Sequence, residues 1–221
     1  MTVRIAASIL SADLTKLRDD VSAVAAGGAD WIHVDVMDGN FVPNITFGQK
    51  ILEALRQVTD LTLDVHLMVK EPERYIESFA DNGANIFTLH PEATVHVQRH
   101  LDQIKNRGMM AGLALNPATP LSFAEEVVAD IDLLLLMTVN PGFSGQRYIP
   151  ASTEKIRRAR TILDAAGSNA YLEVDGGITR KTIAEAFAAG ADTFVAGSAI
   201  FKSSDPAAEV AELRTLCQRL E

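Results

Sequence analysis

The chain has 221 residues, 48% of them hydrophobic and 22% charged, which is typical of a globular protein with a large buried core. The formal net charge of −9 argues against nucleic acid as a partner, because binding to nucleic acid depends on a basic surface. The single cysteine, Cys217, excludes a disulfide within the chain and a zinc cage built of cysteines.

The N-terminal residues run directly into a strand-like segment, without the basic region and long apolar run of a signal peptide. The most apolar window, Leu133–Val139, is too short to span a bilayer. We therefore expect a cytoplasmic protein that has no membrane partner.

Eight short apolar runs of strand type alternate with longer segments of helical period. The predicted strands are Ile5–Leu10, Trp31–Met37, Thr62–Met68, Ile86–His90, Met110–Leu115, Leu133–Val139, Tyr171–Val174 and Thr193–Ala196. The clearest predicted helices are Leu14–Ala26, Pro72–Asp81, Thr153–Ala166, Lys181–Ala189 and Pro206–Leu220. A Gly-Ala-Asp or Gly-Ala-Asn sequence stands at three helix-to-strand junctions, beginning at Gly28, Gly83 and Gly190. This α/β alternation predicts one domain, residues 1–221, with a (β/α)₈ TIM-barrel fold.

Polar residues gather at the predicted strand ends, where such barrels place their chemistry. They are Ser8, His33, Asp35, Asp38, His66, His90, Asn116, Asn140, Asp175 and Ser198. His33 and Asp35 are two residues apart on one strand and share a face. Together with His66 and Asp175 they form a candidate site for one divalent cation, and zinc, iron, manganese and cobalt all suit imidazole and carboxylate ligands. The alternative is that each of the four has a separate structural role.

Glycine-rich loops follow the last three predicted strands. They contain Gly142, Phe143, Ser144 and Gly145, then Gly176 and Gly177, then Gly197 and Ser198. Such loops can turn backbone N–H groups toward phosphate oxygens, and this position is the usual phosphate site of these barrels. Taken singly, each pair of glycines is better explained by a tight turn. Three methionines near strand ends, Met37, Met68 and Met137, could form an apolar floor under a substrate, although the sequence alone favours simple core filling.

The ordered motifs Ser8–Asp13, His33–Gly39, Asp64–Val69, Val139–Phe143 and Asp175–Ile178 resemble the ribulose-phosphate 3-epimerase family, and the resemblance covers nearly the whole chain. It implies a metal-dependent isomerase of carbohydrate metabolism, in the pentose phosphate pathway or carbon fixation. One divalent ion per chain is implied, with zinc first, and the family commonly forms homodimers or hexamers. The sequence departs from the family pattern at Ser144 and Ala199, where glycine is usual.

The resemblance also implies roles for single residues. His33, Asp35, His66 and Asp175 would be metal ligands, and Asp35 and Asp175 the acid/base pair. Ser8, His66 and the three methionines would contact the substrate, and the glycine-rich loops would bind its phosphate. Epimerisation next to a ketone needs a proton removed from one face and supplied to the other, which two carboxylates with different pKa values can do.

Three alternatives remain open at this point. The first is an epimerase of a related sugar phosphate, such as allulose 6-phosphate. The second is a decarboxylase on a similar barrel, although the segment Asp64-Val65-His66 lacks the lysine that such enzymes use. The third is a sugar-phosphate binder without catalysis.

Overall fold

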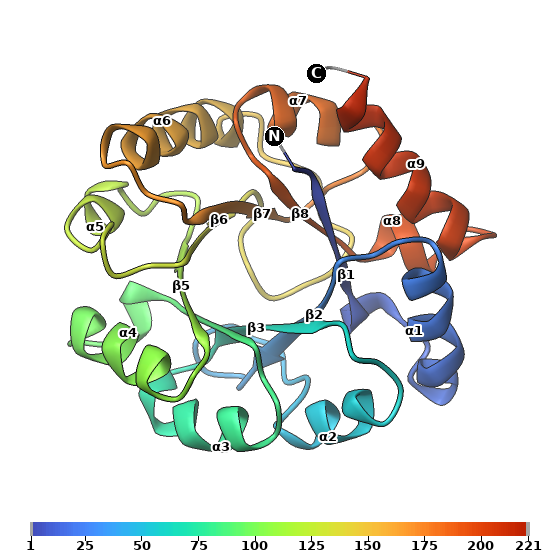
Figure 1. Cartoon of the computed structure of the whole chain (residues 1–221), viewed down its shortest axis with the longest axis horizontal. Helices are drawn as coiled ribbons and strands as arrows, with labels where there is room; N and C mark the ends of the chain where they lie inside the picture. Colours follow the sequence, from blue (N-terminus) through green and yellow to red (C-terminus); the bar gives the residue numbers. More distant parts are fainter. Residues whose placement is uncertain (1, 220–221) are drawn as a thin grey trace.

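The computed structural model describes residues 2–219. Eight parallel strands form a closed barrel, and each strand is hydrogen-bonded to the next in chain order. The strands are β1 Arg4–Ser8, β2 Trp31–Met37, β3 Thr62–Met68, β4 Ile86–Leu89, β5 Met110–Leu115, β6 Leu133–Met137, β7 Tyr171–Asp175 and β8 Thr193–Ala196. Helices surround the barrel on all sides (Figure 1). The predicted (β/α)₈ fold is confirmed.

The α-helices are α1 Leu17–Ala26, α2 Lys50–Arg56, α3 Ile76–Asp81, α4 Val97–Asn106, α5 Ser122–Glu125, α6 Ser152–Ala165, α7 Ile183–Ala188, α8 Ser198–Phe201 and α9 Pro206–Gln218. Short 3₁₀ turns cover Ile9–Ser11, Leu14–Lys16, Pro72–Tyr75 and Pro91–Ala93. None of these helices has the length and apolar character needed to cross a membrane. The predicted end of the last helix, Leu220, lies outside the described residues.

The first strand ends earlier than predicted. Residues Ile9–Ser11 form a 3₁₀ turn because the Ser8 side chain accepts a hydrogen bond from the Leu10 N–H and caps the turn. Ile9 is nevertheless fully buried, and an apolar residue of this kind follows the strand pattern in sequence without being part of the strand. The turn brings Ser8 and Leu10 to the end of the barrel.

The repeated Gly-Ala-Asx junction has a structural basis. Gly28, Gly83 and Gly190 have φ values of 88°, 90° and 109°, in the left-handed region that follows many helices. Two residues later, the side chains of Asp30, Asn85 and Asp192 accept hydrogen bonds from the backbone N–H groups of Ile5, Leu63 and Leu172, respectively. Each junction therefore ends a helix and ties the next strand to its neighbour.

Alternation along each strand separates two environments. On β2, Ile32, Val34 and Val36 pack outward against the helices, whereas His33 and Asp35 point into the barrel. The register pairs His33 with Asp64, Asp35 with His66, and Met37 with Met68. Polar side chains of β2 and β3 therefore occupy matching levels inside the barrel.

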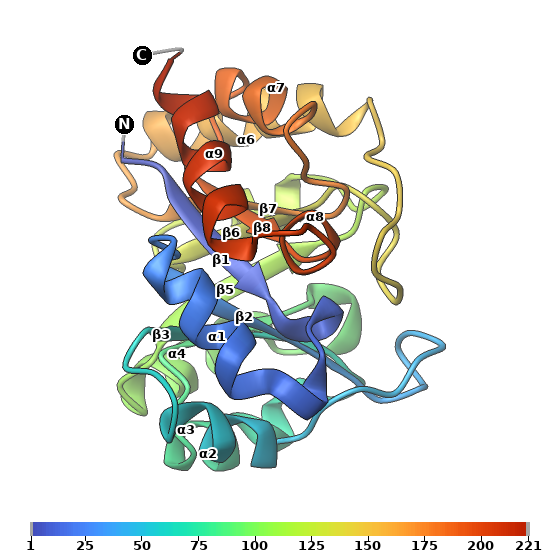
Figure 2. The ribbon, with the colours of Figure 1, turned by 90° about the vertical axis from the view of Figure 1, so that its right-hand side faces the viewer.

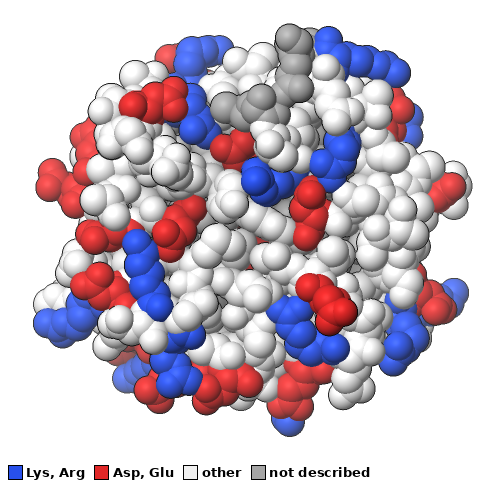
Figure 3. Space-filling view, viewed as in Figure 1, with Lys and Arg blue, Asp and Glu red and all other residues white. Residues whose placement is uncertain are grey.

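The two ends of the barrel differ. The long loops after β2 (light blue) and β6 (yellow) extend at the end opposite the chain termini (Figure 2). The end with the termini carries acidic and basic side chains interspersed, without a broad basic area (Figure 3). The carboxyl-terminal strand ends, where the predicted site residues lie, therefore open on the side of the long loops, which we call the mouth.

Candidate metal centre and sugar-phosphate pocket

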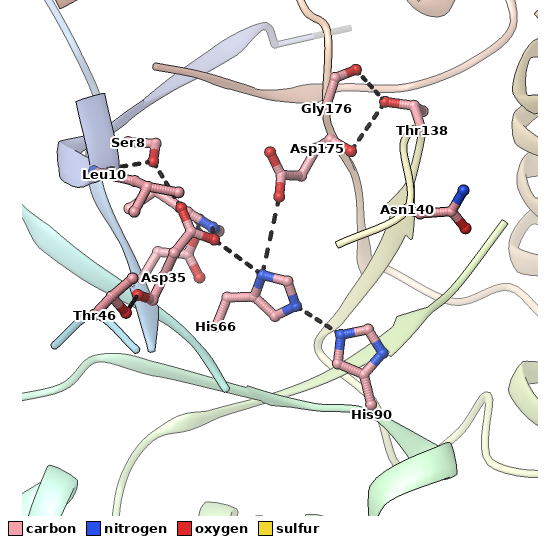
Figure 4. Close-up of polar contacts among 12 residues, drawn as sticks. Ser8, Leu10, Asp35, Thr46, His66, His90, Thr138, Asn140, Asp175 and Gly176 are labelled. Carbon is pink, nitrogen blue, oxygen red and sulfur yellow. Dashed lines mark hydrogen bonds and ion pairs between the residues drawn. The ribbon is translucent and has the colours of Figure 1, made fainter. Parts of the chain in front are cut away.

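Four side chains from three strands converge below the mouth. His33 and Asp35 come from β2, His66 from β3 and Asp175 from the end of β7, and one ligand atom of each lies within 4.8 Å of the others. His33 and His66 are fully buried, and Asp35 is nearly so. The structure thus brings together the four residues that the sequence grouped. Figure 4 shows three of them, Asp35, His66 and Asp175.

Asp35 lies at the centre of this cluster. Its Oδ1 atom is 3.3 Å from both His33 Nε2 and His66 Nδ1, and its Oδ2 atom accepts a 2.7 Å hydrogen bond from the Ser8 hydroxyl. The Oδ2 atom of Asp175 lies 3.9 Å from His66 Nδ1 (Figure 4). His33 Nε2 and His66 Nδ1 are therefore the inner nitrogens of the cluster.

The outer nitrogen of each ring has its own partner. His33 Nδ1 is 2.5 Å from Asp64 Oδ2, and the Glu173 carboxyl group lies beside Asp64. His66 Nε2 is 2.8 Å from Nε2 of His90, the residue that follows β4. Such outer partners fix the orientation of metal-binding histidines.

The pKa values of the two histidines are shifted in opposite directions. Burial lowers the pKa of His66 to about 4, although Asp35 opposes this change. Burial also disfavours the charged form of His33, but the Asp64 and Asp35 carboxylates outweigh it and raise the pKa of His33 well above its ordinary value. The cluster thus supplies one neutral imidazole and holds a positive charge at the other.

The pKa values of the two central carboxyl groups are also shifted in opposite directions. Burial disfavours ionised Asp35, but His33 and His66 outweigh that effect and lower the pKa of Asp35. Burial and the Asp35 charge raise the pKa of Asp175 to about 7. One carboxyl group is therefore ionised at neutral pH, whereas its neighbour is readily protonated.

The donor set fits a divalent cation. Two imidazoles and two carboxylates make a ligand set suited to zinc and neighbouring transition metals. Both outer ring nitrogens have partners elsewhere, so a bound cation would replace the proton on the inner nitrogen of His33 and would share one point with the inner nitrogen of His66. The Asp64 and Asp35 carboxylates, which raise the pKa of His33, also favour a cation at this point.

A pocket above the cluster collects the other predicted residues. Its lining includes Ser8, Asp35, Met37, Met68, Met137, Gly142, Phe143, Ser144, Gly145, Asp175, Gly176, Gly177, Gly197 and Ser198. Met37, Met68 and Met137 are almost completely buried, so they fill core as well as line the pocket. Core filling is therefore confirmed, and their role as a floor under a substrate stays a prediction.

The glycines of this pocket adopt backbone conformations that other residues avoid. Gly142, Gly176 and Gly177 have φ values of 122°, 119° and 67°. A Cβ on Gly177 would overlap the Tyr148 backbone, and the Thr138 hydroxyl donates to the carbonyls of Asp175 and Gly176. The loops after β6 and β7 are thus packed closely against each other.

Besides the three histidines, three of the polar strand-end residues do not line this pocket. The Asp38 carboxylate accepts hydrogen bonds from the N–H groups of Asn40, Phe41 and Lys70, so it ties its own loop to the segment after β3. The Asn140 carbonyl accepts a hydrogen bond from the Gln146 side chain. Asn116 lies after β5, and its carbonyl accepts a hydrogen bond from Lys155.

The sequence interpretation missed several residues around the cluster. Asp64 and Glu173, which support His33 inside the barrel, were not identified as site residues. A signal existed, because Asp64 is two residues before His66, and Glu173 two before Asp175, on the same strand face. The sequence assigned no role at the site to His90, nor to Ser11 and Ile178 of the pocket lining, although all three lie in motifs of the family resemblance.

A buried carboxylate and imidazole cluster, under a glycine-lined pocket at the carboxyl end of a (β/α)₈ barrel, defines a class of barrel enzymes acting on small phosphorylated molecules. The model of the ribulose-phosphate 3 epimerase family matches residues 4–201, and the chain belongs to this family. The expected family and enzyme class, an isomerase, are thereby confirmed.

Curated relatives agree over nearly the full length. The ribulose-phosphate 3-epimerase of Bacillus subtilis (strain 168) is 50% identical over 213 residues, which cover 96% of this chain and 98% of the relative. The Escherichia coli (strain K12) enzyme of the same name is 50% identical over 212 residues, covering 96% and 94%. The solved structure of KGPDC from Streptococcus mutans has a TM-score of 0.72 at 15% identity, covering 99% of each chain, and shows the shared fold alone.

Proposed function

We propose that the chain interconverts D-ribulose 5-phosphate and D-xylulose 5-phosphate through an enediolate. The observation that carries this proposal is the pair of carboxyl groups, Asp35 and Asp175, which face one pocket and have pKa values displaced in opposite directions. Family membership and the names of the relatives support the same substrate pair.

The two carboxyl groups divide the proton transfers between them. In the state described, ionised Asp35 removes the proton from the third carbon of the substrate, and protonated Asp175 delivers a proton to the opposite face. In the reverse direction the roles exchange. The Ser8 hydroxyl orients Asp35 by donating to its Oδ2 atom, so that Oδ1 stays toward the histidines.

We assign His33, Asp35, His66 and Asp175 as the ligands of one divalent ion, with zinc preferred and iron, manganese or cobalt as alternatives. When bound, the ion supplies Lewis-acid stabilisation of the negative charge that develops on the substrate oxygens. Exhaustive chelation should abolish turnover, and added zinc should restore it. A metal-free protein with full activity would remove the ion from the proposal.

The phosphate group of the substrate is assigned to the loops after β6, β7 and β8. Gly142–Gly145, Gly176, Gly177, Gly197 and Ser198 line the same pocket as the two carboxyl groups, and glycine at these positions lets backbone N–H groups face an anion. Binding the phosphate there fixes the reacting carbon relative to Asp35 and Asp175. Met37, Met68 and Met137 supply the apolar part of the lining.

Proton exchange in deuterated water tests the whole proposal. Ribulose 5-phosphate should gain deuterium at its third carbon while xylulose 5-phosphate forms. No exchange by zinc-loaded protein would overturn the assignment, and exchange confined to a six-carbon ketose phosphate would redirect it to a related epimerase. We further propose that residues 1–221 form one catalytic domain of a cytoplasmic homo-oligomer, and sedimentation would establish its size.

A further inference from the structure

The outer nitrogen of His66 meets a second histidine, whereas that of His33 meets a carboxylate. We propose that Glu92 fixes the proton of His90 on Nδ1 and, through His90, holds His66 in the tautomer whose Nδ1 atom is free to bind a metal. Glu92 and His90 are then positioning residues. The inference rests on the proposed function, because it takes His66 as a metal ligand.

The contact between the two rings couples their tautomers. The facing nitrogens, His66 Nε2 and His90 Nε2, are 2.8 Å apart, and both side chains are fully buried (Figure 4). Between two neutral imidazoles at this distance, one nitrogen must donate and the other must accept. A proton on Nδ1 of His90 therefore requires the His66 proton to be on Nε2, and the opposite arrangement requires it on Nδ1.

Glu92 decides between these two arrangements. Its Oε2 atom lies 3.4 Å from His90 Nδ1, at ion-pair distance, and this nitrogen has no hydrogen-bond partner among residues 2–219. A buried ring N–H needs an acceptor, and a carboxylate supplies one. A proton on His90 Nδ1 makes His90 Nε2 the acceptor from His66, so that the lone pair of His66 Nδ1 faces the metal position beside Asp35 and Asp175. The Asp35 Oδ1 atom, 3.3 Å away, is the competing acceptor for a proton on His66 Nδ1.

The other oxygen of Glu92 is fixed by the loop after β5. The Asn116 N–H donates to Oε1 at 3.2 Å, and the Thr119 hydroxyl donates to the same atom. Lys155 anchors this loop by donating to the carbonyls of Asn116 at 2.6 Å and Thr119 at 2.7 Å. Because a backbone N–H can only donate, the atom in the Oε1 position must be an acceptor.

This requirement makes Glu92→Gln a sharp test. The glutamine must turn its oxygen toward Asn116, so its NH₂ group points at His90 Nδ1. His90 Nδ1 then accepts, His90 Nε2 donates to His66 Nε2, and the His66 proton moves to Nδ1, the metal-facing atom. The substitution thus changes the predicted tautomer of a ring that Glu92 does not contact directly.

Glu73 offers a matched control. Its Oε2 atom is 3.8 Å from Nδ1 of another histidine, His100, and its side chain is 28% exposed, against 25% for Glu92. His100 is not among the four clustered residues. Glu73→Gln therefore makes the same chemical change beside a histidine that the proposed metal site does not use.

The experiment measures zinc binding to metal-free protein by chelator competition, together with the nitrogen NMR signals of its five histidines. We expect Glu92→Gln to raise the zinc dissociation constant about 10- to 100-fold and to move the His66 proton from Nε2 to Nδ1. Glu73→Gln should change neither quantity. Unchanged zinc affinity and an unchanged His66 signal in Glu92→Gln would overturn the inference.

Wild-type protein separates the remaining outcomes. If wild type does not bind zinc, the proposed metal function fails, whatever the variants do. If Glu92→Gln does not fold, the wild-type nitrogen signals decide the tautomers. Protons on His90 Nδ1 and His66 Nε2 support the inference, and the reverse pattern overturns it.

Discussion

The two sides of the barrel mouth work in different ways. On the side of β2 and β3, imidazoles and carboxylates project into the barrel, fully or nearly buried, with hydrogen-bonding partners at matching levels. On the side of β6, β7 and β8, the pocket lining includes loop glycines, and Gly142, Gly145, Gly176 and Gly177 have positive φ values. Asp175 is at the end of β7, on the side of the glycine-rich loops, but its carboxyl group joins the cluster of β2 and β3 side chains.

This difference separates reactivity from anchoring. Side chains on strands hold charges and protons at fixed atoms, which proton transfer needs. Backbone N–H groups in glycine-rich turns can surround an anion without adding a formal charge, which suits a protein with a net charge of −9. Substitutions on the two sides should therefore affect different kinetic constants.

The largest effect is expected at Asp175. Asp175→Asn removes one member of the acid/base pair, so kcat should fall by about 10²- to 10⁴-fold even at saturating zinc. Asp38→Asn is the control, since among residues 2–219 the Asp38 carboxylate bonds only backbone N–H groups of loops at the mouth. Steady-state kinetics would check both, and near-normal turnover by Asp175→Asn would remove Asp175 from the mechanism.

Gly177→Ala tests the backbone side. Its φ of 67° and the overlap of a Cβ with Tyr148 should lower stability by at least about 1–2 kcal/mol and raise KM for the sugar phosphate. Gly108→Ala is the matched control, because Gly108 has a similar φ of 77° but open space around the position of an added Cβ. Equal KM values for the two variants would contradict a special role for the Gly177 loop.

The charge cluster should also affect stability as pH changes. The folded-state pKa of Asp175, about 7, exceeds its ordinary value of 3.8, because of burial and the Asp35 charge. Its contribution to the stability of metal-free protein is therefore present below about pH 4 and lost as pH rises through 7. Each pKa unit corresponds to about 1.4 kcal/mol, so Asp175→Asn should gain at most a few kcal/mol relative to wild type between pH 5 and pH 8. Thermal melts of chelated proteins would check this, and a pH-independent difference would contradict it.

The smallest effect is expected at Ser144, where the family pattern has glycine. Within residues 2–219, Glu71 is the only non-glycine residue with positive φ, so the Ser144 backbone does not require glycine. Ser144→Gly should cost no more than about 0.5–1 kcal/mol of stability and leave KM almost unchanged. A large fall in KM would show that Ser144 weakens phosphate binding.

Periodicity predicted the barrel because each βα unit repeats the same physical requirements. An apolar strand has to be buried, and a left-handed residue has to end the helix before the next strand. The error at Ile9 arose because burial alone does not distinguish a strand from a capped turn. The short helix α8 lay where the sequence suggested only a glycine-rich loop.

The predicted ligand set required only that four residues stand at strand ends. The residues that contact these ligands could not be predicted in this way, because a contact such as that of His66 with His90 depends on the direction of side chains on two neighbouring strands. Tautomers and the displaced pKa values depend on three-dimensional distances, so no spacing in the chain could have given them. Asp64 and Glu173 were detectable in principle, by extending the two-residue alternation one step below His66 and Asp175.

Glu173 and Asp64 lie at the heart of the barrel with no exposed surface, and burial together with the Asp64 charge raises the pKa of Glu173 well above its ordinary value. Apolar side chains of similar size would fill that space without desolvating carboxyl groups. Directed evolution that rewards heat resistance alone should therefore replace this pair, whereas selection for turnover should retain it. The residues found at positions 64 and 173 of an evolved variant would thus show whether it was selected for heat resistance or for turnover.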